Sequence, residues 1–130
     1  MERHQLPQKN RMRDLQDLKV WGKAHQLVLD IYKASGGFPR SEIYALTSRF
    51  RRAAISIASN IAEGCGRKTE TEFARFLQIA MGSASEVQYE RLLARDLGFV
   101  NEREFQQLEG AVTEVKRMLP VLIQKLTAES

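Results

Sequence analysis

The chain has 130 residues, of which 43% are apolar and 28% are charged, and it carries a formal net charge of +4 at pH 7. A chain of this length and composition forms one globular domain and buries enough surface to fold without metals or disulfides. Its single cysteine, Cys65, excludes an intrachain disulfide, which is typical of proteins from a reducing compartment.

The amino-terminal residues 1–16 are polar and charged, and they lack the apolar core of a signal peptide. No apolar run in the sequence approaches the ~20 residues that cross a membrane. We therefore expect a cytoplasmic protein with no membrane partner. Residues 1–16 are predicted to be a mobile basic tail, and residues 17–127 the folded domain.

Charge is distributed unevenly along the chain. Residues 1–68 hold 13 Lys and Arg against 6 Asp and Glu, whereas residues 69–130 hold 7 against 10. A basic half favours an anionic partner such as nucleic acid, or an acidic protein surface. A solvated helical surface with no such partner accounts for the same counts, because the net charge is small.

The first two predicted helices are amphipathic, and glycines end them. Apolar residues recur at spacings of three and four over residues 17–35 and again over 41–63, which predicts two helices with one buried face each. Asp17 is the expected N-cap of the first helix, and Gly36 and Gly37 end it. The second helix is expected to bury Ile43, Leu46, Phe50, Ala53, Ala54, Ile57 and Ile61.

The last two predicted helices, residues 70–97 and 102–126, each begin with a capping box. The two boxes are Thr69 with Glu72 and Asn101 with Glu104. Pro120 either bends the fourth helix or interrupts it near Leu119. The fourth helix is expected to bury Phe105, Leu108, Val112, Val115, Leu119, Leu122 and Leu126.

These four helices are joined by short connections, which favour antiparallel neighbours. The sequence therefore predicts an all-α fold, an up-down-up-down antiparallel four-helix bundle. Some apolar residues fall outside the inner faces and would be exposed in a monomer. Exposed apolar patches usually mark interfaces, so we expect a homo-oligomer. The residues concerned are Val20, Leu29, Tyr32, Ile79 and Leu92.

Recognisable catalytic patterns are missing from the sequence. His4 and His25 have no metal-ligand spacing, and a metal site needs three or four ligands. The segment Gly64–Lys68 lacks the upstream glycine of a phosphate-binding loop. Cys65 lies beside cationic residues, but no base or orienting group accompanies it. We expect no enzyme activity, no catalytic residue, no metal, no cofactor and no small-molecule substrate.

Small and polar residues line one side of the second and third predicted helices. Gly82 in mid-helix costs about 1 kcal/mol relative to alanine, and a close contact between helices would offset that cost. The stripe is either a tight helix pair with internal salt bridges or an interface or ligand groove lined by Arg and Glu. Its candidate residues are Ser56, Ser59, Glu63, Arg75, Gly82 and Glu86.

Basic residues gather at both ends of the second helix and in the tail. Contacts from such residues to nucleic acid would be mainly to phosphates. The candidate nucleic-acid-binding residues are Arg49, Arg51, Arg52, Arg67 and Lys68, with Arg11 and Arg13 in support.

Two stretches of sequence, LTSRFRRAAISIASNIAEG and EFARFLQIAMGSASE, resemble the 23S rRNA intervening-sequence protein family, also called the four-helix bundle protein family. The opening DLKVWGKAHQLVLDIYK is similar to the usual start of that family, and the resemblance covers residues 14–126. It implies a bundle that assembles into a pentameric ring and has no enzymatic activity. A related branch, the accessory variability proteins of diversity-generating retroelements, implies contact with a nucleic-acid-bound protein.

Two functions agree with these observations. The first is a non-enzymatic homo-oligomeric binding module whose basic patches contact RNA or an RNA–protein complex. The alternative is a structural or protein-interaction oligomer without nucleic-acid affinity, which the small net charge favours.

Overall fold

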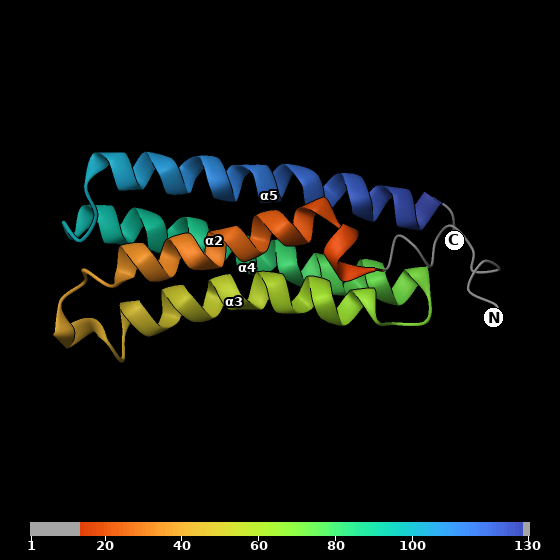
Figure 1. The fold of residues 1–130 in the computed structure, drawn as a ribbon, viewed down its shortest axis with the longest axis horizontal. Helices are drawn as coiled ribbons and strands as arrows, with labels where there is room; N and C mark the ends of the chain where they lie inside the picture. The colour runs from red at the N-terminus through yellow and green to blue at the C-terminus, as the bar shows by residue number, and fades with distance from the viewer. Residues whose placement is uncertain (1–13, 129–130) are drawn as a thin grey trace.

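The computed structural model describes residues 14–128 and shows an all-α fold with four long helices (Figure 1). These are α2 (Lys19–Ser35), α3 (Leu46–Cys65), α4 (Glu70–Asp96) and α5 (Glu102–Ala128). Two short 3-10 helices, η2 (Leu15–Asp17) and η3 (Arg40–Glu42), precede α2 and α3.

Successive helices run in opposite directions, and each packs against the next along the chain (Figure 1). The bundle closes where α2 packs against α5, which is the one seam between helices that are remote in sequence. The predicted four-helix architecture with packing between neighbouring helices is therefore confirmed. The loop between α3 and α4, the start of α2 and the end of α5 lie at one end of the bundle, and the other two loops lie at the opposite end.

The start of α2 differs from the prediction. The N-cap position is Leu18 and no side chain caps the helix, because Asp17 belongs to η2. The backbone of Leu18 is extended, and its side chain is buried against the core. Val20, expected on an outer face, is also buried, with only 3% of its surface exposed. Packing of Leu18 and Val20 against the bundle fixes the register here.

The start of α3 also lies further along the chain than predicted. After Pro39 the backbone forms η3 and a turn, and the helix begins only at Leu46. The carboxylate Oε1 of Glu42 accepts a hydrogen bond from the Leu46 backbone nitrogen at 3.2 Å. Ile43 lies in the turn and is exposed, so its predicted place in the core is wrong. The other six predicted core residues of this helix are buried.

The later helix boundaries follow local signals closely. Thr69 Oγ1 accepts a hydrogen bond from the Glu72 nitrogen at 3.1 Å, and Asn101 and Glu104 exchange two such bonds at 2.8 and 3.0 Å. Gly98, with a φ of 79°, ends α4 in the left-handed conformation that glycine adopts freely.

Helix α5 continues through Pro120, whose side chain is exposed. Ile123, which is buried, takes the inner position expected for Leu122, which is half-buried. The other six residues predicted for the inner face of this helix are buried. Four apolar residues expected outside the core are exposed in the single chain, namely Leu29, Tyr32, Ile79 and Leu92.

Candidate interaction surfaces

The last turn of α3 packs closely against the first turns of α4. A Cβ added to Gly64 would lie 2.8 Å from Phe76 Cβ and 2.9 Å from Phe73 Cδ1. Closer to the middle of the seam, the hydroxyls of Ser56 and Ser83 are hydrogen-bonded at 2.8 Å. Small residues therefore allow α3 and α4 to pack closely at Gly64 and at Ser56. Of the predicted stripe residues, Ser56 takes part in this contact.

Gly82 takes no part in this close approach. It is exposed, and an added Cβ would have no neighbour within 4 Å. The predicted close helix contact at Gly82 is wrong within the chain, because Ala80 and Ala84 occupy the buried face of α4 instead. The close approach is made by Gly64, which lies in the last turn of α3.

The remaining stripe residues lie on the outside of the bundle. Ser59, Glu63, Arg75 and Glu86 are all exposed. Glu63 forms a 2.7 Å ion pair with Arg67, and the guanidinium carbon of Arg75 lies 5.1 Å from the centroid of the Phe76 ring. These four residues are available to an interface, whereas Ser56 serves packing within the chain.

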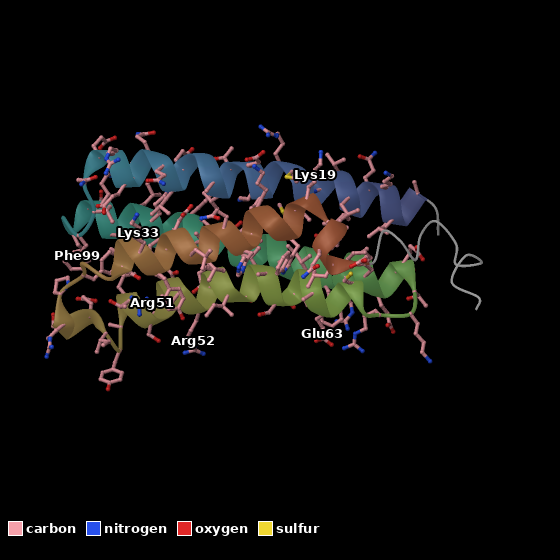
Figure 2. All side chains as sticks on the ribbon, viewed as in Figure 1. Lys19, Lys33, Arg51, Arg52, Glu63 and Phe99 are labelled. Carbon is pink, nitrogen blue, oxygen red and sulfur yellow. The ribbon has the colours of Figure 1, made fainter. Side chains whose placement is uncertain are left out.

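The three arginines near the start of α3 point in different directions. Arg51 Nε donates a hydrogen bond to Ser35 Oγ at 2.8 Å, and its guanidinium carbon lies 4.5 Å from the centroid of the Tyr32 ring. Arg51 thereby ties α3 to the last turn of α2. Arg52 is exposed and points away from the bundle (Figure 2). Arg49 turns toward α4, where its Nε lies 3.9 Å from Glu90 Oε2.

Arg67 and Lys68 lie in the loop after the end of α3, and the helix between Arg52 and Cys65 is about 20 Å long at 1.5 Å per residue. The guanidinium carbon of Arg67 lies 4.9 Å from the centroid of the Phe76 ring. Lys68 is exposed and makes no ion pair with a described residue. The candidate cations therefore form two separate sites, one at each end of α3. The two tail candidates, Arg11 and Arg13, lie outside the described residues.

A groove that the sequence did not reveal opens between α3 and α4 at the end where Tyr44 and Leu97 lie. Its volume is about 700 Å³. We name it the acidic groove after its three carboxyl side chains, Glu42, Glu86 and Glu90. Its lining also includes Tyr44, Arg49, Tyr89 and Leu97. A second hollow of about 360 Å³ shares Arg49 and Glu86 with it and extends to Arg52 and Ser56.

Glu90 is the unusual residue of this groove, because only 3% of its surface is exposed. Burial, reinforced by the neighbouring Glu86 carboxyl, raises the pKa of Glu90 from 4.5 to about 8, against the opposing charge of Arg49. The Oε1 atom of Glu90 has no hydrogen-bond partner among the described residues. The spacing of Val87, Glu90 and Ala94 along the inner face of α4 is the sequence signal that could have located it.

Arg91 is also buried, and it joins α4 to α5. One terminal nitrogen donates to the Phe105 carbonyl oxygen at 3.0 Å, and the other lies 2.5 Å from Glu109 Oε1. Its guanidinium carbon lies 3.8 Å from the centroid of the Phe105 ring. Burial lowers the pKa of Arg91, while the charge of Glu109 raises it. These contacts are all internal, so we assign Arg91 a structural role.

Two negative findings apply to residues 14–128. None of the helices there has the length and apolar character required to cross a membrane. No three His, Cys, Asp or Glu side chains gather there in a way that could hold a metal ion.

The fold resembles that of a solved structure from the S23 ribosomal protein family. A crystal structure of a protein of unknown function from the S23 ribosomal protein family of Bacteroides thetaiotaomicron has a TM-score of 0.75 against this chain. The two share 20% sequence identity, and the match covers 81% of this chain and 95% of the other. Likeness at this identity supports the four-helix fold alone.

None of the curated proteins matches this sequence. A family match, by contrast, covers residues 16–120 and is described as 23S rRNA-intervening sequence protein. That range includes both stretches on which the resemblance was based, together with the α3–α4 seam and the acidic groove. The chain belongs to the 23S rRNA-intervening sequence protein family.

Proposed function

We propose that this protein is a non-enzymatic, homo-oligomeric binding module that contacts the phosphates of RNA through separate basic sites. The observation that carries the nucleic-acid part is the position of Arg52 and Lys68. Both are exposed, and neither makes an ion pair with a described residue. Cations that no carboxylate neutralises are the ones available to phosphate.

The structure narrows the set of candidate residues. Arg51 is held by Ser35 and Tyr32, so it does not present a free guanidinium to a phosphate. Arg49 lies 3.9 Å from Glu90 Oε2, but its side chain is 72% exposed, so it stays a secondary candidate beside Arg52. Arg67 forms an ion pair with Glu63, so we expect it to contribute less to phosphate binding than the neighbouring Lys68 does. Each chain then offers two small basic sites, separated by about 20 Å of α3 at 1.5 Å per residue. Such sites bind weakly one at a time, and an oligomer would add them through avidity.

Assembly is supported by the exposed apolar side chains of the single chain. Leu29, Tyr32, Ile79 and Leu92 are exposed, and so are Tyr44 and Tyr89 beside the acidic groove. We expect sedimentation equilibrium at micromolar concentration to give a mass well above the 14.9 kDa of one chain. The proposed ring corresponds to five chains. A single species of 14.9 kDa at every concentration would contradict assembly.

We expect the double variant Arg52→Glu, Lys68→Glu to bind a structured RNA more weakly than the wild type at low salt. Each lost phosphate contact should reduce the slope of log affinity against log salt by about 1, so the double variant should lose about 2 for each chain of the oligomer that contacts the RNA. Fluorescence anisotropy at about 50 and 200 mM salt measures both quantities. The matched control is Lys19→Glu, Lys125→Glu, which makes the same change in charge where α2 and α5 meet.

The alternative is a protein-interaction oligomer without nucleic-acid affinity. The acidic groove favours it on one face, because the carboxylates of Glu42 and Glu86 there repel phosphate. If the wild type shows no salt-dependent RNA binding at the lower salt concentration, this alternative replaces the RNA proposal. If the double variant and its control lose the same affinity, Arg52 and Lys68 are not the contacts.

A further inference from the structure

Another groove, between α2 and α5, is lined only by apolar and basic side chains. Its volume is about 560 Å³, and it lies where α2 begins and α5 approaches its end. The hollow at the other end of the same seam differs, because Asp30 and Glu104 line it as well as two cations. We name the first of these the basic groove. Its apolar lining residues are Leu18, Val20, Met118, Val121 and Leu122.

The three charged side chains that line the basic groove are all cations, and little opposing charge reaches them. Lys19, labelled in Figure 2 where α2 meets α5, and Lys125 make no ion pair with a described residue. Arg117 Nη2 lies 3.8 Å from Glu114 Oε2, but the other oxygen of that carboxylate lies 3.4 Å from Lys23 Nζ. One carboxylate is therefore shared between two cations, and the groove stays positively charged.

The basic groove exists because α5 extends past the start of α2 (Figure 1). The backbone of Leu18 is extended, so the chain before Lys19 bends into η2 and does not prolong α2 along α5. As a result, α2 leaves apolar side chains of α5 partly uncovered, and Val121 is 66% exposed. A helix laid along α5 at this place would cover them.

The chemistry of the basic groove suits an acidic amphipathic helix. Apolar lining gains free energy from apolar side chains, which a phosphate backbone lacks, and cations without partners favour carboxylates. From Arg117 to Lys125 the groove follows α5 for about 12 Å at 1.5 Å per residue, which two turns of a bound helix would match. Helices that bind in grooves place apolar side chains at i, i+3, i+4 and i+7 over that length. Residues 1–13 of this chain do not fit, because they hold four Lys and Arg against one Glu.

We propose that the basic groove is a docking site for an acidic amphipathic helix of a partner protein, whose apolar side chains enter the groove and whose carboxylates pair with Lys19 and Lys125. This inference goes beyond the proposed function, because it concerns a different partner and a different seam from those of Arg52 and Lys68. The combination of an apolar lining with cations alone carries it.

The probe is a fluorescent synthetic peptide of about 14 residues, with leucines at i, i+3, i+4 and i+7 and glutamates beside them. Fluorescence anisotropy with the full chain should show saturable binding at concentrations up to about 100 μM. A peptide of the same composition in scrambled order has no apolar face and should bind at least about tenfold more weakly. Equal binding of the two peptides, or no binding of the first, would overturn the docking site.

The double variant Lys19→Gln, Lys125→Gln tests the charged contacts. It removes two exposed ion pairs, each of which contributes modestly, so the affinity for the peptide should fall about threefold to tenfold. The matched control, Lys33→Gln, Arg103→Gln, removes two charges at the other end of the same seam and should bind within about twofold of the wild type. An equal loss in both variants would reduce the effect to net charge and contradict the assignment.

Val121→Glu tests the apolar contact. It places a carboxylate against the apolar face of the peptide, and the affinity should fall by about tenfold or more. Val121 is exposed, so the fold should tolerate the change, which circular dichroism will check. The matched control, Gln78→Glu, adds the same charge at an exposed position of α4 and should keep the affinity. Wild-type affinity in Val121→Glu would overturn the proposal.

Three further results would assign the groove to another occupant and overturn the proposal. Vesicles containing phosphatidylserine that bind the wild type but not Val121→Glu would indicate a membrane. A structured RNA that binds Lys19→Gln, Lys125→Gln more weakly than the control variant would indicate phosphate. A change in oligomer mass in Val121→Glu would indicate a second copy of the chain. By contrast, Arg52→Glu, Lys68→Glu should keep the peptide affinity within about twofold, so the RNA proposal and this inference can fail separately.

Discussion

Replacing Gly64 with alanine should lower the free energy of unfolding by about 1–3 kcal/mol, the usual cost of overpacking a tight core. The new Cβ would lie 2.8 Å from Phe76 Cβ, 2.9 Å from Phe73 Cδ1 and 3.1 Å from the Phe73 carbonyl oxygen. A backbone oxygen and a Cβ on α4 cannot move without shifting the helix. The strain therefore exceeds the gain of about 1 kcal/mol that alanine normally brings to a helix interior.

Gly82→Ala is the matched control, because Gly82 is exposed in the middle of α4 and an added Cβ would meet nothing within 4 Å. Here the helix propensity acts alone, and we expect the free energy of unfolding to rise by about 1 kcal/mol. Urea unfolding at one protein concentration measures both variants. Stabilisation by Gly64→Ala would show that α3 and α4 are further apart than described.

The second large effect is a dependence of stability on pH that Glu90 creates. At concentrations low enough to keep the chain monomeric, the free energy of unfolding should fall as the pH rises from about 5 to about 8. The pKa of Glu90 is about 8 in the folded chain, whereas the ordinary value for a glutamate, which we take for the unfolded chain, is 4.5. In that range the folded state retains a proton that the unfolded state has lost, so each pH unit favours unfolding by up to about 1.4 kcal/mol. Above pH 8 both states are ionised and the loss is complete.

Glu90→Gln should remove this contribution, because glutamine cannot ionise. Other carboxyls titrate in both proteins, so the informative quantity is the difference between their unfolding free energies from urea titrations across the range. That difference should grow in favour of the variant as the pH rises toward 8. Parallel curves would mean that Glu90 ionises near its ordinary pKa, as an exposed glutamate does.

Local signals predicted most of the helical framework. The two capping boxes and Gly98 set boundaries through hydrogen bonds between residues that are close in sequence, so the sequence alone contains the cause. The periodicity of the apolar residues located the inner faces for the same reason. At Pro120 the sequence left two possibilities, and the structure has the continuous helix.

The predictions from sequence were wrong at positions where tertiary packing determines whether a residue is buried. Ile43 fits the helical period, but the chain turns between Pro39 and Leu46, and nothing in the apolar pattern records that turn. Val20 was assigned outside the inner stripe, but the bundle covers it. Gly82 and Gly64 are both glycines within helices, and only the position of α3 against α4 shows which one a neighbour approaches.

The interaction surfaces were harder to predict than the helices. Arg49, Arg51 and Arg52 are nearly consecutive in sequence. Each step along an α-helix rotates the side chain by about 100° around the helix axis, so these three arginines point in different directions. Their composition alone could not predict which of them is exposed. The acidic groove combines the turn before α3 with the middle and end of α4, and residues this far apart in sequence meet only in the folded chain.

The order of the seams has a consequence for how the chain folds. Three of the four seams join helices that are neighbours in sequence, and each can form as a local hairpin at a small cost in loop-closure entropy. Only the pairing of α2 with α5 encloses most of the chain. A low relative contact order of this kind is characteristic of rapid folding, with the hairpins formed early and the α2–α5 seam closed last. A chain that is still being synthesised can therefore form the α2–α3 and α3–α4 seams before its last helix is available.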